Sequence, residues 1–128
     1  MIMNDLNKLS KEVYRRNVEK GFYEKAKNIG EMIALMHSEL SEALEADRKG
    51  KYAKADMETW NLLSGSPTSE DFRELFQETV KDTFEDEMAD LFLRLMDICG
   101  YLNIDIERHV AAKLRYNLTR EKYHGKKY

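Results

Sequence analysis

Two pairs of acidic residues are the part of this sequence most able to do chemistry. Glu39 and Glu42 form one pair, and Glu87 and Asp90 form the other. Residues three positions apart share one face of a helix, so each pair can present two carboxylates to one ligand. Buried carboxylates need a cation beside them. Ligation by oxygen alone favours Mg²⁺, with Mn²⁺ as the alternative, over zinc. We predict that these four carboxylates hold a divalent metal ion.

Spacing alone does not single out these pairs. The chain has 24 acidic residues and five acidic pairs at this spacing, while chance alone gives about four or five in so acidic a chain. A solvated acidic face is therefore the simplest interpretation of any one pair. The neighbours distinguish Glu39/Glu42 and Glu87/Asp90, because these pairs lie on the two most apolar predicted helices. Arg94, one turn from Asp90, is an alternative source of positive charge.

The first of these helices is predicted over Ile29–Asp47. Asn28 and Glu31 form a capping-box-like start, and Gly50 follows as a stop. A core-facing stripe about 100° wide is expected. Its members are Ile29, Ile33, Met36, Leu40, Ala43 and Leu44. Glu39 and Glu42 fall on the flank of this stripe, where we expect them to be half-buried.

The second helix is predicted over Phe84–Cys99, with Asp82 or Thr83 as its cap and Gly100 as its end. Apolar residues surround it almost completely, which is typical of a central, enclosed helix. Cys99 is the only cysteine. We expect it to be a buried thiol in a reducing compartment.

One proline and six glycines provide few breaks, which favours long helices over many short strands. The further helices start at Asn4 or Asp5 and run to about Lys20, span Glu70 to about Val80, and start at Asn103 or Asp105 and run to about Tyr123. Residues 64–69 form a loop. Residues 51–69 show no decisive spacing.

The last predicted helix carries a row of polar residues. Lys113, Asn117, Arg120 and His124 follow one another in steps of four, three and four residues, which places them on one face. They are either a helix end emerging into solvent or a set of groups that binds phosphate.

Composition narrows the possible partners. A chain of 128 residues is expected to form a single domain, residues 1–128. A net charge of −3 argues against a nucleic-acid polymer as partner.

No apolar run approaches the roughly 20 residues that span a membrane, and the start lacks the pattern of a secretory signal. We expect a cytoplasmic protein without a membrane partner.

The motifs together resemble the MazG-like all-α nucleoside triphosphate pyrophosphohydrolases. Glu39-Leu-Ser-Glu42 and Glu87-Met-Ala-Asp90 are similar to that family's Glu-x-x-Glu and Glu-x-x-Asp pair. The likeness extends to the residues before the first motif and to Lys113-Leu-Arg-Tyr-Asn117-Leu-Thr-Arg120. Two features depart from the family. Ser38 stands where the family often has another glutamate, and 44 residues, a longer gap than usual, separate Glu42 from Glu87.

The resemblance implies an antiparallel four-helix bundle-like domain that assembles as a homodimer or a dimer of dimers. An inserted segment with a short helix, within residues 43–86, would separate the second and third core helices. The implied activity is Mg²⁺-dependent hydrolysis of the α–β phosphoanhydride of a (deoxy)nucleoside triphosphate, which gives a monophosphate and pyrophosphate and serves nucleotide-pool house-cleaning. The implied metal ligands and catalytic residues are Glu39, Glu42, Glu87 and Asp90, and the implied substrate-binding residues are Lys113, Asn117 and Arg120.

Several alternatives stay open. A catalytically impaired helical interaction module that retains a metal site is one, and Ser38 is the residue that favours it. In the inserted segment, Tyr52, Trp60 and Phe72 either stack on a base or pack the segment down, and packing is favoured. A di-iron bundle needs two Glu-x-x-His motifs, whereas this chain has one, Glu121-x-x-His124. No P-loop or nucleophile-elbow pattern occurs.

Overall fold

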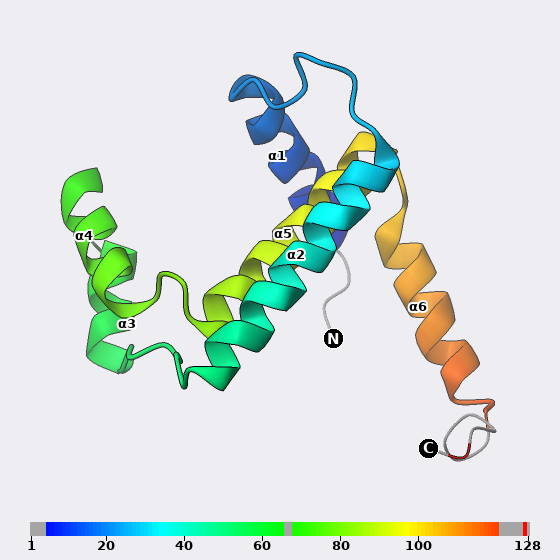
Figure 1. Ribbon diagram of the computed structural model, residues 1–128. Coiled ribbons are helices and arrows are strands. Elements are labelled where there is room, and N and C mark those ends of the chain that lie inside the picture. Colours follow the sequence, from blue (N-terminus) through cyan, green and yellow to red (C-terminus); the bar gives the residue numbers. More distant parts are fainter. Residues whose placement is uncertain (1–4, 66–67, 121–126, 128) are drawn as a thin grey trace. The chain divides into compact units, whose positions relative to one another are not determined.

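Six helices and no strand make up the described part of the chain, which confirms the all-α prediction (Figure 1). The computed structural model describes residues 5–65, 68–120 and 127. The helices are α1 (Leu6–Glu19), α2 (Ile29–Arg48), α3 (Met57–Gly65), α4 (Ser69–Thr79), α5 (Phe84–Tyr101) and α6 (Ile106–Asn117). No helix among these residues is both long enough and apolar enough to span a bilayer.

The chain divides into two compact units. One is Lys27–Arg94 and the other combines Met1–Ala26 with Leu95–Tyr128. The first unit holds α2, α3, α4 and the first part of α5, and the second holds α1, the end of α5 and α6. A single domain over residues 1–128 stays a prediction.

Side-chain caps start most of the helices, as the local sequence predicts. The Asn28 side chain accepts a hydrogen bond from the backbone N–H of Glu31 at the start of α2. Thr83 caps α5 through the N–H of Asp86, and Asp105 caps α6 through the N–H of Arg108. Asp5 occupies the cap position of α1 but makes no side-chain cap bond. The alternative cap Asn4 lies outside the described residues.

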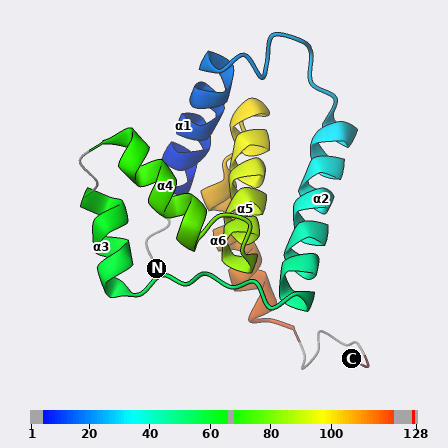
Figure 2. The ribbon, with the colours of Figure 1, turned by 60° about the vertical axis from the view of Figure 1, so that its left-hand side comes forward.

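Within the unit Lys27–Arg94, α2 and the first part of α5 lie side by side and run in opposite directions (Figures 1 and 2). The pairing follows from their contacts. Glu39, early along this stretch of α2, binds Arg94 on α5, whereas the later Glu42 lies close to the earlier Glu87. The first residue of α5 also bonds to the segment that follows α2, because the N–H of Phe84 donates to the carbonyl of Lys51. This pairing brings together acidic residues that are 45 positions apart in the chain (42 to 87).

The buried face of α2 differs from the predicted stripe. Four of the six predicted core residues, Ile29, Ile33, Leu40 and Leu44, are 42–50% exposed. The residues actually buried are Met32, Glu39, Ala43 and Ala46. At 100° per residue, this face is rotated by about a quarter of a turn from the predicted one. The face that carries Glu39 is buried because α5 presents Arg94 and Glu87 to it. The prediction for α5 is also partly wrong. It was expected to be surrounded by other elements on nearly every side, but Phe92 and Leu93 are exposed.

The helix α5 runs through Gly100 to Tyr101, past its predicted end at Cys99. Gly100 does not end the helix. It lies where α1 crosses close to α5 within the second unit. A Cβ atom at Gly100 would lie 2.5 Å from the backbone oxygen of Ser10 and 2.7 Å from Cβ of Tyr14. The buried Ser10 hydroxyl donates to the carbonyl of Met96 at 2.9 Å. Cys99 is buried beside this crossing, as predicted.

The segment between α2 and α5 contains one helix more than predicted. Asp56 caps α3 by accepting from the N–H of Thr59 at 2.8 Å, and α3 packs against α4. The predicted loop 64–69 is correspondingly shorter, since Gly65 ends α3 and Ser69 begins α4. Residues 66 and 67 lie outside the described residues. The side chains of Tyr52, Trp60 and Phe72 are all 42–46% exposed. These rings, which were expected to pack the segment down, are therefore only about half buried.

The helix α6 ends at Asn117, earlier than the predicted end near Tyr123. Arg120 therefore follows the helix and does not continue the face of Lys113 and Asn117. His124, the Glu121-x-x-His124 motif and the predicted end at Tyr123 lie outside the described residues.

Candidate metal centre between α2 and α5

Three of the four predicted carboxylates converge within one unit. Glu39 and Glu42 on α2 and Glu87 on α5 each place one oxygen so that all three oxygens lie within 4.8 Å of one another. Glu39 and Glu87 are buried, with 6% and 5% of their surface exposed, and Glu42 is exposed. Asp90, one turn further along α5, is exposed and does not belong to this group.

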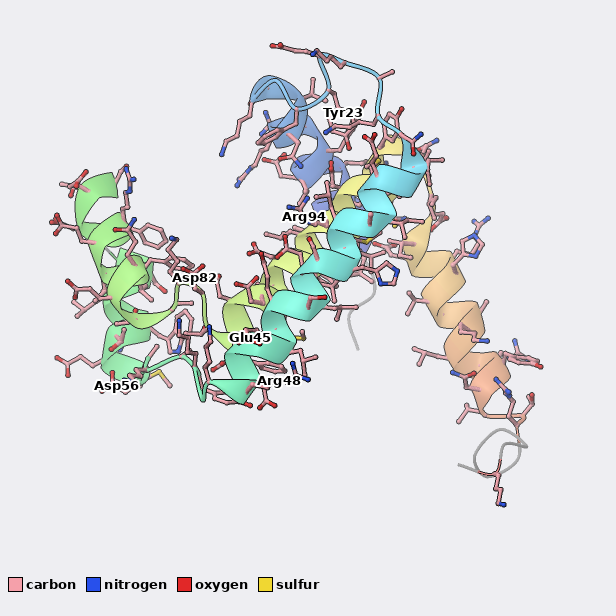
Figure 3. All side chains as sticks on the ribbon, viewed as in Figure 1. Tyr23, Glu45, Arg48, Asp56, Asp82 and Arg94 are labelled. Carbon is pink, nitrogen blue, oxygen red and sulfur yellow. The ribbon has the colours of Figure 1, made fainter. Side chains whose placement is uncertain are left out.

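Arg94 supplies positive charge to one carboxylate. Its Nε donates to Oε1 of Glu39 at 2.8 Å, and this ion pair joins α5 to α2. Figure 3 labels Arg94. The Glu39 side chain is 8% exposed and that of Arg94 is 41% exposed. Arg94 thus forms its ion pair with Glu39, whereas the sequence pointed to its helix neighbour Asp90, on which Arg94 acts only through its charge.

Two buried oxygens in the cluster have no hydrogen-bond partner among the described residues. They are Oε2 of Glu39 and Oε2 of Glu87. A buried oxygen of this kind costs free energy unless a donor or a cation satisfies it. Carboxylate oxygens at this spacing are the donor set that Mg²⁺ and Mn²⁺ prefer. The residues present therefore fit a divalent cation.

The electrostatics of the three carboxylates are unequal. Burial raises the pKa of Glu39, but the hydrogen bond from Arg94 and close side-chain contacts with Glu42 and Glu87 bring its pKa below the ordinary value. Burial, close side-chain contacts with Glu42 and Glu39, and the negative charges of Glu42 and Asp90 raise the pKa of Glu87 to about 8. At neutral pH the metal-free cluster therefore keeps Glu39 ionised and a proton on Glu87. Burial and the charges of Asp86 and Glu39 also raise the pKa of Asp90.

A second acidic group shares Glu87 with the first. Asp82, Asp86 and Glu87 also place one oxygen each within 4.8 Å of one another. Asp86 accepts from the N–H of Asp82 at 2.9 Å, and its own N–H donates to Thr83. These bonds form a capping arrangement at the start of α5, which accounts for Asp86 without a ligand. Sequence reasoning missed this group, although Thr83-x-x-Asp86 was a visible capping signal.

Ser38 contributes no ligand to the cluster. Its hydroxyl donates to the carbonyl of Leu35 at 2.6 Å and the residue is exposed.

The three predicted substrate-binding residues belong to the other unit. Lys113 lies on α6 with its Nζ 5.0 Å from the centre of the Tyr116 ring, and the guanidinium carbon of Arg120 lies 5.7 Å from the same ring. Oδ1 of Asn117 is buried without a hydrogen-bond partner among the described residues. Lys113 and Arg120 thus lie beside the ring of Tyr116, a residue that the sequence reasoning did not single out.

Comparison of the chain with protein-family models, with curated proteins and with solved structures found no match.

Proposed function

We propose that the chain is a metal-dependent hydrolase that cleaves the α–β phosphoanhydride of a (deoxy)nucleoside triphosphate and releases pyrophosphate. One observation carries the proposal. Three carboxylates from α2 and α5 converge, and the two buried ones, Glu39 and Glu87, each keep an oxygen without a partner among the described residues. The motif resemblance supplies the substrate class, and house-cleaning of the nucleotide pool is the role it implies.

In this proposal, Glu39, Glu42 and Glu87 hold Mg²⁺, and Asp90 is the fourth ligand that the resemblance implies. Mn²⁺ is the alternative ion. When bound, a divalent cation polarises the phosphate and lowers the pKa of a bound water. Arg94 fixes the Glu39 carboxylate in place through the bond from its Nε.

A carboxylate oxygen that does not bind the ion accepts the proton of the attacking water. A phosphorus–oxygen bond to the water oxygen forms as the anhydride bond breaks. Lys113, Asn117 and Arg120 contact the phosphates, as the resemblance implies.

The direct test is a panel of canonical and modified nucleoside triphosphates incubated with the full chain and Mg²⁺. Release of pyrophosphate with the monophosphate is the expected result, and chelation of the metal should stop it. Orthophosphate as the sole product would place the cleavage at another bond, and no product with any nucleotide would reject the activity.

We also propose the finer architecture, which is an antiparallel four-helix bundle that assembles as a homodimer or a dimer of dimers. The exposed stripe on α2 supports it, because Ile29, Ile33, Leu40 and Leu44 form a row of half-exposed apolar side chains. Contiguous apolar patches of this kind mark surfaces that bind another protein surface.

Replacement of Leu40 by Glu should break this assembly, because it places a charge in the apolar row. We expect the wild type to elute above its chain mass of 15.1 kDa in light-scattering chromatography, and Leu40→Glu to shift towards that mass. Ala34→Glu is the matched control, because Ala34 is exposed and lies about 110° around α2 from the centre of this row. Equal masses for all three proteins would argue against an interface on this row.

A helical binding module with a residual metal site is the second candidate function. The exposed apolar row on α2 and the position of Ser38, which offers no ligand, favour it. Metal binding without release of pyrophosphate from any nucleotide would support it. In either case we propose a cytoplasmic location, with which the buried free thiol of Cys99 is consistent.

A further inference from the structure

A charged cavity adjoins the carboxylate cluster. It has a volume of about 300 Å³ and lies where α2 ends and α5 begins. Its charged lining consists of Lys49, Lys51, Glu42, Glu45, Asp82 and Glu87. Two members, Glu42 and Glu87, belong to the candidate metal centre, so the cavity opens directly onto it.

The backbone holds Lys51 in a fixed place at this cavity. Its N–H donates to the carbonyl of Ala46 at 2.8 Å, and its carbonyl accepts from the N–H of Phe84, also at 2.8 Å. Gly50, with φ of +66°, makes the turn that leads into it. Lys51 is thus pinned between the last turn of α2 and the first residue of α5.

Lys49 is held less firmly, which leaves it available to a ligand. Its Nζ lies 3.4 Å from Oε1 of Glu45, and the two side chains are 57% and 52% exposed. Ion pairs between such exposed groups contribute little free energy. A more highly charged anion can therefore take the place of Glu45.

The lining of the cavity suits phosphate better than a nucleobase. Apart from Ala46, every residue that lines it is charged, and none is aromatic. A base is usually held by stacking on an aromatic ring, whereas phosphate oxygens are held by cationic donors. The four carboxylates outnumber the two ammonium groups, so an anion alone would be repelled and needs a divalent cation with it.

We propose that Lys49 and Lys51 bind the diphosphate end of the substrate, while Glu42 and Glu87 hold the cation that accompanies it. This proposal rests on the proposed function and adds a phosphate subsite within the same unit as the metal centre. The Lys49 ammonium leaves Glu45 for the phosphate, and the Lys51 ammonium contacts it from the segment that follows α2.

The test is calorimetric titration of the full chain with inorganic pyrophosphate in the presence and absence of Mg²⁺. The double variant Lys49→Ala/Lys51→Ala should lose at least about tenfold in affinity for pyrophosphate with Mg²⁺. Its affinity for Mg²⁺ alone should be retained. The matched control is Arg48→Ala/Lys54→Ala, which removes the same charge from nearby positions that do not line the cavity. Circular dichroism checks that both variants are folded.

The outcomes separate this proposal from the proposed function. The subsite would be overturned if both double variants lost the same affinity for pyrophosphate, or if neither variant lost any. It would also be overturned if the wild type did not bind pyrophosphate with Mg²⁺. If the lysine variant alone loses affinity but no nucleotide is hydrolysed by the wild type, the subsite stands and the hydrolase fails. If nucleotides are hydrolysed with an unchanged KM in the lysine variant, the hydrolase stands and the subsite fails.

Discussion

Replacement of Glu87 by Gln is expected to abolish metal-dependent turnover while leaving the metal-free protein folded. Glu87 is buried, and its raised pKa of about 8 means that it carries a proton at neutral pH without metal. Glutamine has the shape of the protonated acid, so the free energy of unfolding should change by less than about 0.5 kcal/mol. Glutamine offers no anionic oxygen to the ion, and we expect kcat/KM to fall by at least about 100-fold.

Thermal unfolding provides a readout that does not depend on turnover. A ligand that binds only the folded state raises the melting temperature. Mg²⁺ should therefore raise it for the wild type and for Glu74→Gln, which changes an exposed acid on α4, but not for Glu87→Gln. A normal metal response and normal turnover in Glu87→Gln would remove Glu87 from the site.

Replacement of Gly100 by Ala should destabilise the second unit. The new Cβ would lie 2.5 Å from the backbone oxygen of Ser10, and a backbone atom cannot move aside as a flexible side chain can. Overpacking of this kind costs about 1–3 kcal/mol, which exceeds the gain of about 1 kcal/mol from placing alanine in a helix. The expected result is a lower denaturation midpoint, with faster amide exchange in α1.

The matched control is Gly65→Ala at the end of α3, where an added Cβ meets no atom within 4 Å. This change should be neutral or slightly stabilising. If both variants behave alike, the close crossing of α1 and α5 at Gly100 is wrong.

The sequence alone predicted most of the helices and their caps. Asn28, Thr83 and Asp105 act as caps because a capping bond joins residues only three positions apart. The few glycines and the single proline favoured long helices, but residues 51–69 were left undecided and α3 was missed. Its only signal was the short cap at Asp56.

The site was predicted in part. The apolar neighbours of Glu39 and Glu42 predicted half-buried carboxylates that face those of α5. The structure buries Glu39, leaves Glu42 exposed and brings both close to Glu87. The same reasoning placed Asp90 in the group, from which the structure leaves it out. It also could not show that Lys49 and Lys51 line a cavity beside the cluster, because that depends on how the end of α2 meets the start of α5.

The face that α2 buries was decided by tertiary structure alone. Hydrophobic periodicity selected the row that includes Leu40, yet the helix turns Glu39 inward and leaves Leu40 about half exposed. The physical reason is that α5 presents Arg94 at this position, and the ion pair with Glu39 forms only on the inward face. Periodicity reports which residues avoid water, whereas only the neighbouring helix determines which of them this chain covers.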